Sequence, residues 1–490
     1  MGEVVGEPDR QSSSSSSSDA GGAAPPRRRP LGVLPLIALI FYDVSGGPFG
    51  VEDSVRGGGG PLLSLLGFVL FPAIWSLPEA LITAELASSF PENGGYVLWI
   101  SSAFGPFWGF QEGVWKWVSG TMDNALYPVL FLDYLRGSLP LFALPAARAP
   151  ALVALTAALT FLNYRGLHLV GLSALALTAF SLSPFVVLAL LAAPRLRPAR
   201  WLAFDPKALD LRTYFNSMFW NLNYWDKAST LAGEVDNPSR SFPRAVFGAV
   251  GLVVASYLVP LMAGTGAMAG SSPENWTDGY FAEVGMAIGG PWLRCWIQLA
   301  AAMSNMGLFE AEMSSDSFQL LGMSEMGMLP AVFARRSKYG TPTFSILCSA
   351  TGVILLSCMS FQEIIEFLNF LYALGMLLEF AAFVKLRIKK PDLHRPYKIP
   401  VGTVGAVLIC IPPTFLILIV MSLASIRTFI VSGSVMVFGA LLYFGIEYIK
   451  DKTWVSFIPN PVPSENCFGS LPVQIQETHD DASASLLREP

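Results

Sequence analysis

The sequence has 490 residues, of which 53% are hydrophobic and only 14% are charged. Soluble domains usually carry about 25% charged residues, so this composition excludes an ordinary soluble protein and favours a chain that lies in lipid. The formal net charge of -5 excludes little, because the position of charges matters more than their sum in a membrane protein.

Both ends of the chain are polar. Residues 1–30 contain a serine run, Ser12 to Ser18, and residues 451–490 have similarly low hydrophobicity. Such segments cannot bury enough apolar surface to fold, so we expect two disordered tails around a membrane domain at residues 31–450. The first apolar segment is not expected to be a cleavable signal peptide, because a polar leader precedes it and no A-x-A-like site closes it.

Twelve apolar segments lie between these tails. A hydrocarbon core of about 30 Å needs roughly 20 residues of helix to cross it. Segments of this kind begin near residues 31, 62, 106, 146, 168, 213, 244, 281, 341, 361, 402 and 427. The sequence therefore predicts an all-α polytopic membrane protein with about twelve transmembrane helices.

The first of these helices is predicted to be broken. Residues 45–50 read SGGPFG, in which three glycines weaken a helix and the proline removes a backbone donor. Non-helical backbone at membrane depth persists only where it is buried in protein or lines a cavity. A plain proline kink is the alternative, but a break halfway along a helix indicates a transporter binding site.

The sixth helix is the second irregular one. Residues 213–235 contain three asparagines, Asp226 and Lys227, and their middle is rich in Trp and Tyr. Such a helix is too polar to face lipid and must face other helices or water. Breaks in the first and sixth helices are what an inverted repeat of two five-helix halves predicts.

The distribution of Lys and Arg favours cytoplasmic tails. This orientation places Arg27–Arg29 and the basic run at residues 385–398 in the cytoplasm, although the cluster at residues 195–212 goes against the rule. The sequon Asn275-Trp276-Thr277 then falls in the outer loop between helices seven and eight. Asn275 is therefore a candidate for glycosylation.

Charged residues within the apolar segments are mostly acidic. An unpaired carboxylate in hydrocarbon costs at least about 2.5 kcal/mol, whereas an ammonium group over an aromatic ring gains about 0.5–2 kcal/mol. The acidic surplus, interleaved with aromatic rings, favours a cationic substrate or carboxylates that hold protons; structural ion pairs with the two lysines are the alternative. The acidic residues are Asp43, Glu79, Asp123, Asp226, Glu310, Glu312 and Glu379, against Lys116, Lys227 and Arg294.

Several motifs resemble the amino acid–polyamine–organocation superfamily, in its L-type-like branch, and most closely the plant polyamine uptake transporters. The most specific are FWNLNYWDKASTLAGEVDNPSRSFPRA, from residue 219, and KKPDLHRPYKIPVG, from residue 389. The resemblance covers about residues 31–450. It implies a LeuT-like 5+5 inverted repeat with broken helices one and six, two extra helices and transport by alternating access.

The family's binding site is carried over to matching residues of this chain. In amino acid carriers, amides freed by the first break hold the substrate carboxylate, whereas Asp43 lies just before the break here and would repel one. Asp226 falls near the position of the substrate amine, and Trp220 falls at the aromatic gate. The substrate-binding candidates are Asp43, Ser45, Gly46, Gly47, Gly50, Trp117, Asp123, Trp220, Asn223, Trp225, Asp226, Glu310 and Glu312.

Two departures from the family pattern affect coupling and partners. Many proton-coupled relatives have a lysine in helix five where this chain has Ser181, so Asp43, Asp226 and Glu310 become the candidates for carrying the proton. Residues 136–148 contain no cysteine, so no disulfide-linked heavy subunit is expected. No cofactor, metal or nucleic acid is expected either.

The function expected from these observations is proton-coupled uptake of polyamines (spermidine, spermine and putrescine) and of related dications such as paraquat. The plasma membrane is the expected location, with the ER or Golgi as the alternative. A neutral or cationic amino acid exchanger on the same scaffold and a non-transporting nutrient sensor are the rival functions. An enzyme is not expected, because HExxH, GxSxG and Walker motifs are missing from the sequence.

Overall fold

The computed structural model describes residues 30–136, 140–270, 272–357 and 361–459. The serine run and nearly all of both predicted tails lie outside these residues. Within the described part of the chain, the secondary structure is helical, and β-pairing is limited to isolated bridges.

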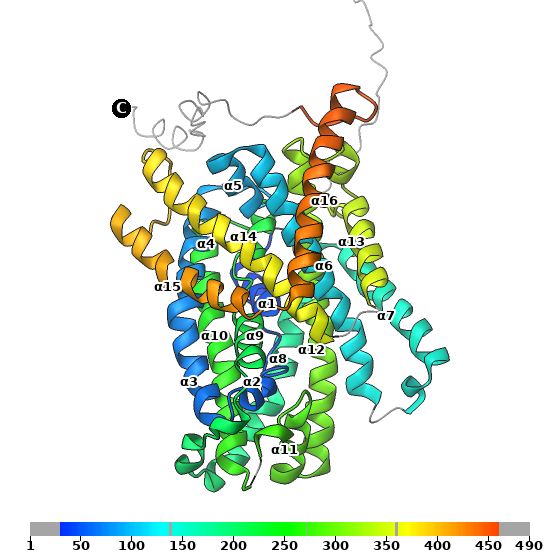
Figure 1. Cartoon of the computed structure of the whole chain (residues 1–490). Coiled ribbons are helices and arrows are strands. Elements are labelled where there is room, and N and C mark those ends of the chain that lie inside the picture. Colours follow the sequence, from blue (N-terminus) through cyan, green and yellow to red (C-terminus); the bar gives the residue numbers. More distant parts are fainter. Residues whose placement is uncertain (1–29, 137–139, 271, 358–360, 460–490) are drawn as a thin grey trace, which may run out of the picture.

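The helices form one elongated bundle (Figure 1). In chain order they are α1 (Val33–Val44), α2 (Glu52–Gly57), α3 (Pro61–Phe71), η1 (Pro72–Ser76), α4 (Leu77–Ser89), α5 (Tyr96–Phe104), α6 (Pro106–Arg136), η2 (Pro140–Ala143), α7 (Pro145–Arg165), α8 (Leu167–Ala192), η3 (Ala193–Arg195), η4 (Pro198–Leu202), η5 (Pro206–Ala208), α9 (Leu211–Leu222), η6 (Lys227–Glu234), α10 (Pro238–Ala267), η7 (Pro273–Asn275), α11 (Tyr280–Gly289), α12 (Pro291–Glu325), η8 (Ala331–Ala334), α13 (Thr343–Leu356), α14 (Phe361–Lys389), α15 (Thr403–Ser422) and α16 (Ile426–Asp451).

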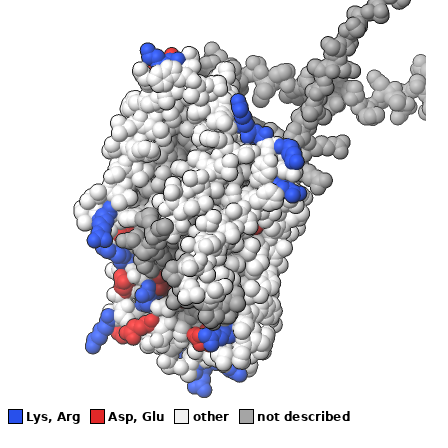
Figure 2. All heavy atoms as spheres, turned by 90° about the vertical axis from the view of Figure 1, so that its right-hand side faces the viewer, with Lys and Arg blue, Asp and Glu red and all other residues white. Residues whose placement is uncertain are grey.

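The outside of the bundle is suited to lipid. Within the described residues, seven helices are apolar and long enough to cross a membrane. Large apolar side chains such as Phe415, Leu441 and Phe444 are exposed on α15 and α16. On the face shown in Figure 2, Lys, Arg, Asp and Glu gather toward the two ends and leave a broad uncharged band between them. This is the surface expected of a multi-pass membrane protein.

The other five predicted spans are either too short or too polar to be counted among these seven helices. Helices α6 and α12 have 31 and 35 residues, but they turn charged side chains into the protein. The first and sixth spans are split into α1 with α2 and α9 with η6, and α13 has only 14 residues. Length is therefore adequate in α6 and α12, and it is their inward-facing charges that lower the hydropathy.

Two predicted boundaries are wrong. The eighth span was placed at residue 281, but residues 280–289 form the separate short helix α11, and α12 begins at Pro291. Gly290 has φ 89°, which ends α11, and a proline suits the first turn of the next helix. The seventh span starts at Pro238 and not near residue 244, again because proline is tolerated at a helix start.

The two broken helices lie side by side at the centre of the bundle. Helix α1 contacts η6 and helix α2 contacts α9, so each half of one broken helix pairs with the opposite half of the other. Figure 1 shows α1 and α9 in the middle of the bundle, where α1 contacts α8, α10 and α12, and α9 contacts α3, α14 and α15. Two stretches of non-helical backbone therefore meet in the protein interior, away from lipid.

Candidate functional site

The first break begins at Ser45, where α1 ends. Gly46, Gly47 and Gly50 have φ angles of 69°, 106° and 82°, a region that residues with a side chain rarely adopt. A Cβ on Gly46 would also lie 2.7 Å from Leu308 of α12. The glycines predicted to open the helix therefore do so, and at Gly46 there is no room for a side chain.

The backbone amides of this break are satisfied within the protein. The Gly47 amide donates to Ser45 Oγ at 3.0 Å, and the Gly50 amide donates to a Glu52 carboxylate oxygen at 2.9 Å. The Gly46 amide bonds to the Phe41 carbonyl at 3.2 Å. These donors are thus occupied by Ser45, Glu52 and α1 itself, which leaves them unavailable to a substrate carboxylate in this conformation.

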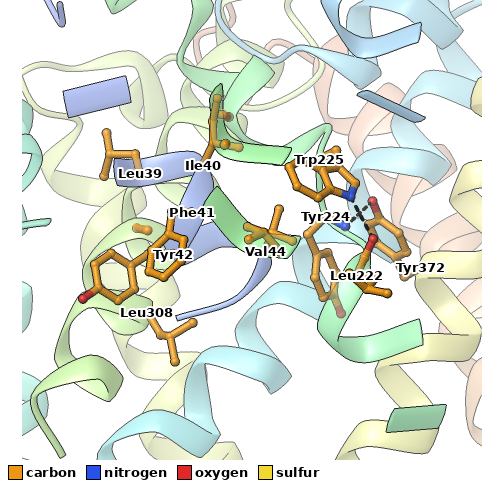
Figure 3. Packing of buried hydrophobic residues seen from close by; sticks show 14 of the residues in the cluster. Leu39, Ile40, Phe41, Tyr42, Val44, Leu222, Tyr224, Trp225, Leu308 and Tyr372 are labelled. Carbon is orange, nitrogen blue, oxygen red and sulfur yellow. Dashed lines mark hydrogen bonds between the residues drawn. The ribbon is translucent and has the colours of Figure 1, made fainter. Parts of the chain in front are cut away.

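The second break spans residues 223–226. Helix α9 ends at Asn223, which has extended backbone, and Tyr224 takes a φ of 70°. The Tyr224 amide donates to Tyr372 Oη at 2.9 Å and the Trp225 amide donates to Glu79 at 2.9 Å. Figure 3 shows Val44, the last residue of α1, beside Tyr224, so the two breaks are adjacent.

A small closed cavity lies between the two breaks. Its volume is about 10 Å³, roughly the space that one water molecule needs. The carboxylates come from α1 and α6. The aromatic rings come from α6, from α9 and from the second break. The lining residues are Asp43, Val44, Ser45, Asp123, Tyr127, Trp220, Asn221, Tyr224 and Leu308.

Asp123 and Trp220 close one side of this cavity. The Trp220 indole N–H donates to Asp123 Oδ1 at 3.1 Å, and Tyr127 Oη donates to Asp123 Oδ2 at 2.7 Å. Trp220 also lines a second pocket, next to Gly50, on the side where α2 lies. The ring therefore separates the central cavity from the space beyond it, which is the place expected of a gate.

A first group of charges surrounds Lys227 and is strongly acidic. Lys227 forms an ion pair with Glu312 of α12, and its ammonium lies 4.4 Å from the centre of the Tyr224 ring. Its charge also acts on Asp43, Asp123 and Asp316. One lysine thus faces four carboxylates next to the cavity.

A second group surrounds Lys116 and contains Asp226. The Lys116 ammonium lies 2.6 Å from Asp226 and 2.8 Å from Glu379, and 3.8 Å from the centre of the Tyr372 ring. Glu112 lies farther away, at 3.9 Å. Asp226 was predicted to sit near the substrate amine, but in this conformation it is fully buried, paired with Lys116 and absent from the cavity lining.

The remaining candidates are dispersed. Trp117 faces away from the cavity, with its indole N–H donating to Ser349 Oγ of α13 at 3.0 Å. Trp225 is buried beside Glu79, and Glu310 accepts a hydrogen bond from Ser173 of α8. Asn223 is buried, and its side-chain amide has no hydrogen-bond partner among the described residues.

Sequence reasoning missed several residues of these two groups. Asp316 lies on α12 four residues after Glu312, and Glu112 lies on α6 four residues before Lys116. Counting along one helix face would have found both. Tyr372 bonds to Glu79 and Asp226, but a single tyrosine in the apolar segment 361–389 gave no signal. Asn275, the glycosylation candidate, is exposed at the end of η7.

A further buried ion pair lies away from these two groups, between α4 and α14. Arg387 Nε of α14 lies 2.6 Å from Glu85 of α4, and the Ile399 amide donates to the same carboxylate at 2.9 Å. Arg395 approaches Glu85 at 3.2 Å. These residues, which we call the Glu85 clamp, join α4, α14 and the loop after α14.

Two adjacent helix breaks around a small, charge-lined cavity, inside a bundle with a lipid-facing surface, define a broken-helix membrane transporter. The family follows from the sequence: a family model described as "Amino acid permease" matches residues 31–442, and the chain belongs to that family. It is a transporter and not an enzyme, as predicted.

Named relatives cover nearly the whole chain. A protein of Arabidopsis thaliana named "Probable polyamine transporter" is 69% identical over 457 residues, which are 93% of this chain and 95% of that protein. "Polyamine transporter PUT1" of Oryza sativa subsp. japonica is 57% identical over 433 residues, 88% of this chain and 81% of the relative. "Polyamine transporter RMV1" of Arabidopsis thaliana is 56% identical over 431 residues, 88% of each chain.

A solved structure supports the architecture. The crystal structure of MhsT in complex with L-phenylalanine matches with a TM-score of 0.60 and 15% identity, over 81% of this chain and all of that chain. At this identity the match concerns the fold alone. It confirms the predicted LeuT-like fold with its broken first and sixth helices.

Proposed function

We propose that this protein takes up polyamines together with protons by alternating access between the two sides of the membrane. The observation that carries the proposal is the small cavity between the helix breaks, lined by Asp43 and Asp123 and by aromatic rings. Relatives that are 56–69% identical are named polyamine transporters, which supports the same substrate class.

The charge balance of the interior favours a cation. Within the described residues, twelve Asp and Glu side chains are buried but only three Lys and Arg side chains are. A buried carboxylate without a partner is costly, and an incoming ammonium group would relieve that cost. Lys227 already shows how the site holds an alkylammonium, with a carboxylate on one side and the Tyr224 ring on the other.

The first break argues against an amino acid. A substrate carboxylate would have to compete with Ser45 and Glu52 for the break amides and would meet Asp43, the residue before the last one of α1. Like charges in a dry site repel strongly. A ligand that carries only ammonium groups avoids both penalties.

We assign the first ammonium group to Asp123. Asp226 already has a counter-charge in Lys116 at 2.6 Å, so a substrate there would have to displace a buried lysine. Asp43 accepts a hydrogen bond from Ser315, and Glu310 accepts one from Ser173. Neither carboxylate forms an ion pair among the described residues. They are the candidates we favour for carrying the coupling proton, with Asp226 the third.

We place both tails in the cytoplasm and the protein in the plasma membrane, as the basic residues indicate. The end of the bundle that carries α2 and α11 then faces outward. Asn275 lies between α10 and α11 at that end, where a glycan can be added to an exposed sequon. Removal of that glycan by an endoglycosidase should shift the mobility of wild-type protein but not of Asn275→Gln.

Uptake by the purified full-length protein in proteoliposomes tests the proposal. Radiolabelled spermidine, putrescine, arginine and leucine are each supplied at two external pH values. We expect uptake of spermidine and putrescine, faster at the more acidic external pH, and little uptake of the two amino acids. Transport of leucine as fast as spermidine would establish an amino acid exchanger. Spermidine binding without counterflow would establish a non-transporting sensor.

A further inference from the structure

A second acidic pocket lies on the outer side of the first break. Its volume is about 260 Å³, more than ten times the space that one water molecule needs. It is bounded by α2, α6, α11 and α12, and neither lysine nor arginine is among the described residues that line it. Glu52, Asp133 and Asp278 supply its acidic groups, and Phe49, Tyr134 and Phe281 supply its aromatic rings.

Glu52 is the unusual member of this pocket. Its side chain is 0% exposed, and Oε2 accepts the Gly50 amide at 2.9 Å. The other oxygen, Oε1, is buried and has no hydrogen-bond partner among the described residues. A buried carboxylate oxygen left without a donor is costly, so this atom is ready to accept one from a ligand.

The neighbouring arginines neutralise only part of this pocket, since Arg148 pairs with its Asp133 and the charge of Arg56 also acts on Asp278. Arg148 is held by Asp133 at 2.6 Å, and Arg56 is held by Asp53 at 2.7 Å. Glu52 and Asp278 remain as the acidic groups without an ion pair among the described residues. The pocket next to Gly50 on the other side of the break differs, because Arg212 lines it. Of these two pockets, the Glu52 pocket is therefore the one suited to a cation.

This pocket lies next to the first break, whose other end lines the central cavity through Ser45, and one of its lining residues is Phe49. It belongs to the first break, and its ring packs against Tyr134 and Phe185 at centroid distances of 6.1 Å and 5.3 Å. Asp43 lies before the break and Glu52 lies after it, so carboxylates bracket the same flexible segment. A chain with ammonium groups at both ends matches this arrangement better than a single cation does.

We propose that Glu52, with Asp278 and the rings of Phe49 and Tyr134, forms an outer binding site for one alkylammonium group of a polyamine. The site is occupied before the substrate reaches Asp123, and it favours polyamines over monoamines because a second ammonium group can enter the central cavity. That the ligand is a polyamine rests on the proposed function.

The test is equilibrium binding of radiolabelled spermidine to full-length protein in nanodiscs, on an Asp123→Asn background that weakens the central site. We expect one remaining site, weakened tenfold or more by adding Glu52→Gln, since a hydrogen bond to a charged group is lost. Glu274→Gln is the matched control: it removes the same charge from an exposed residue of the same end, and we expect no change.

Thermal unfolding of each variant shows whether it is folded, and Asp278→Asn provides a second substitution if Glu52→Gln is not. Residual binding that neither substitution weakens would overturn the outer site. So would complete loss of binding in Asp123→Asn alone, provided that variant is folded. Both results leave polyamine uptake by wild-type protein intact, whereas failure of the proposed function would abolish binding and uptake in the wild type.

Discussion

Asp123 and Asp226 are both buried carboxylates in the centre of the protein, but their surroundings differ. Asp123 borders the cavity and accepts hydrogen bonds from the neutral groups of Trp220 and Tyr127. Asp226 is bound to the charged Lys116 and to Tyr372. Substitution by asparagine, which keeps size and removes charge, should therefore have different consequences at the two sites.

Asp123→Asn is expected to raise the half-saturation concentration for spermidine about tenfold or more, with little loss of stability. The asparagine oxygen can still accept from Trp220, but the charge that binds the ammonium group is gone, and such a bond contributes about 1.5–3 kcal/mol. Initial uptake rates over a range of spermidine concentrations measure the change. An unaltered half-saturation value would exclude Asp123 from the substrate site.

Asp226→Asn is expected to destabilise the protein. It removes the closest counter-charge of Lys116, which is 0% exposed, and breaking a buried ion pair on one side costs about 3–5 kcal/mol. The midpoint of thermal unfolding in detergent should fall, with Glu274→Gln as the exposed control. A variant of unchanged stability that has lost affinity for spermidine would restore Asp226 as the substrate ligand.

The acidic character of the interior could be predicted from single residues, whereas their pairing could not. Asp43 and Asp123 stood out because a carboxylate within an apolar segment is costly. Nothing in the linear sequence shows that Lys116 meets Asp226 across 110 positions, or that Trp117 turns toward α13. Those contacts depend on the rotation of each helix, which packing determines.

At the level of the elements, the first break depends on glycines that a side chain cannot replace. Gly46→Ala should abolish spermidine uptake, because Cβ would meet Leu308 at 2.7 Å and the φ of 69° is strained for alanine. Uptake per surface-expressed molecule is the readout. Gly251→Ala is the matched control, since a Cβ there meets nothing within 4 Å. Normal transport by Gly46→Ala would show that the break is not required.

The helix pattern was largely predictable because lipid imposes long apolar segments. The error at the eighth span has a plain physical origin. Residues 280–289 are apolar, as the start of a membrane span would be. The Gly-Gly-Pro sequence that separates α11 from α12 stops the helix within this apolar stretch. In contrast, the second break was found by its polarity, although its detail, a positive φ at Tyr224, was not.

For the whole molecule, uptake should respond to both the proton gradient and the membrane potential. An inward-negative potential favours entry by about 2.3 kcal/mol per charge per 100 mV, and spermidine carries several charges. In proteoliposomes, a potassium diffusion potential should accelerate uptake, and a protonophore should remove the part driven by the acidic exterior. Uptake that persists unaltered when both the proton gradient and the membrane potential are collapsed would instead indicate an exchanger or a facilitator.

The small cavity has a consequence for how affinity and speed are related. A cavity of about 10 Å³ cannot hold a polyamine. Only the fraction of molecules that has opened can therefore bind one. The measured dissociation constant equals the intrinsic constant divided by this open fraction. Because the Glu85 clamp joins α4, α14 and the loop after α14 in this closed form, we expect substitutions that loosen the clamp to raise the open fraction. Loosening the clamp would make the protein appear to bind more tightly while the return to the closed form became slower. Tight binding and fast turnover are therefore competing properties in this protein, and a variant selected for the first is expected to be a poorer carrier.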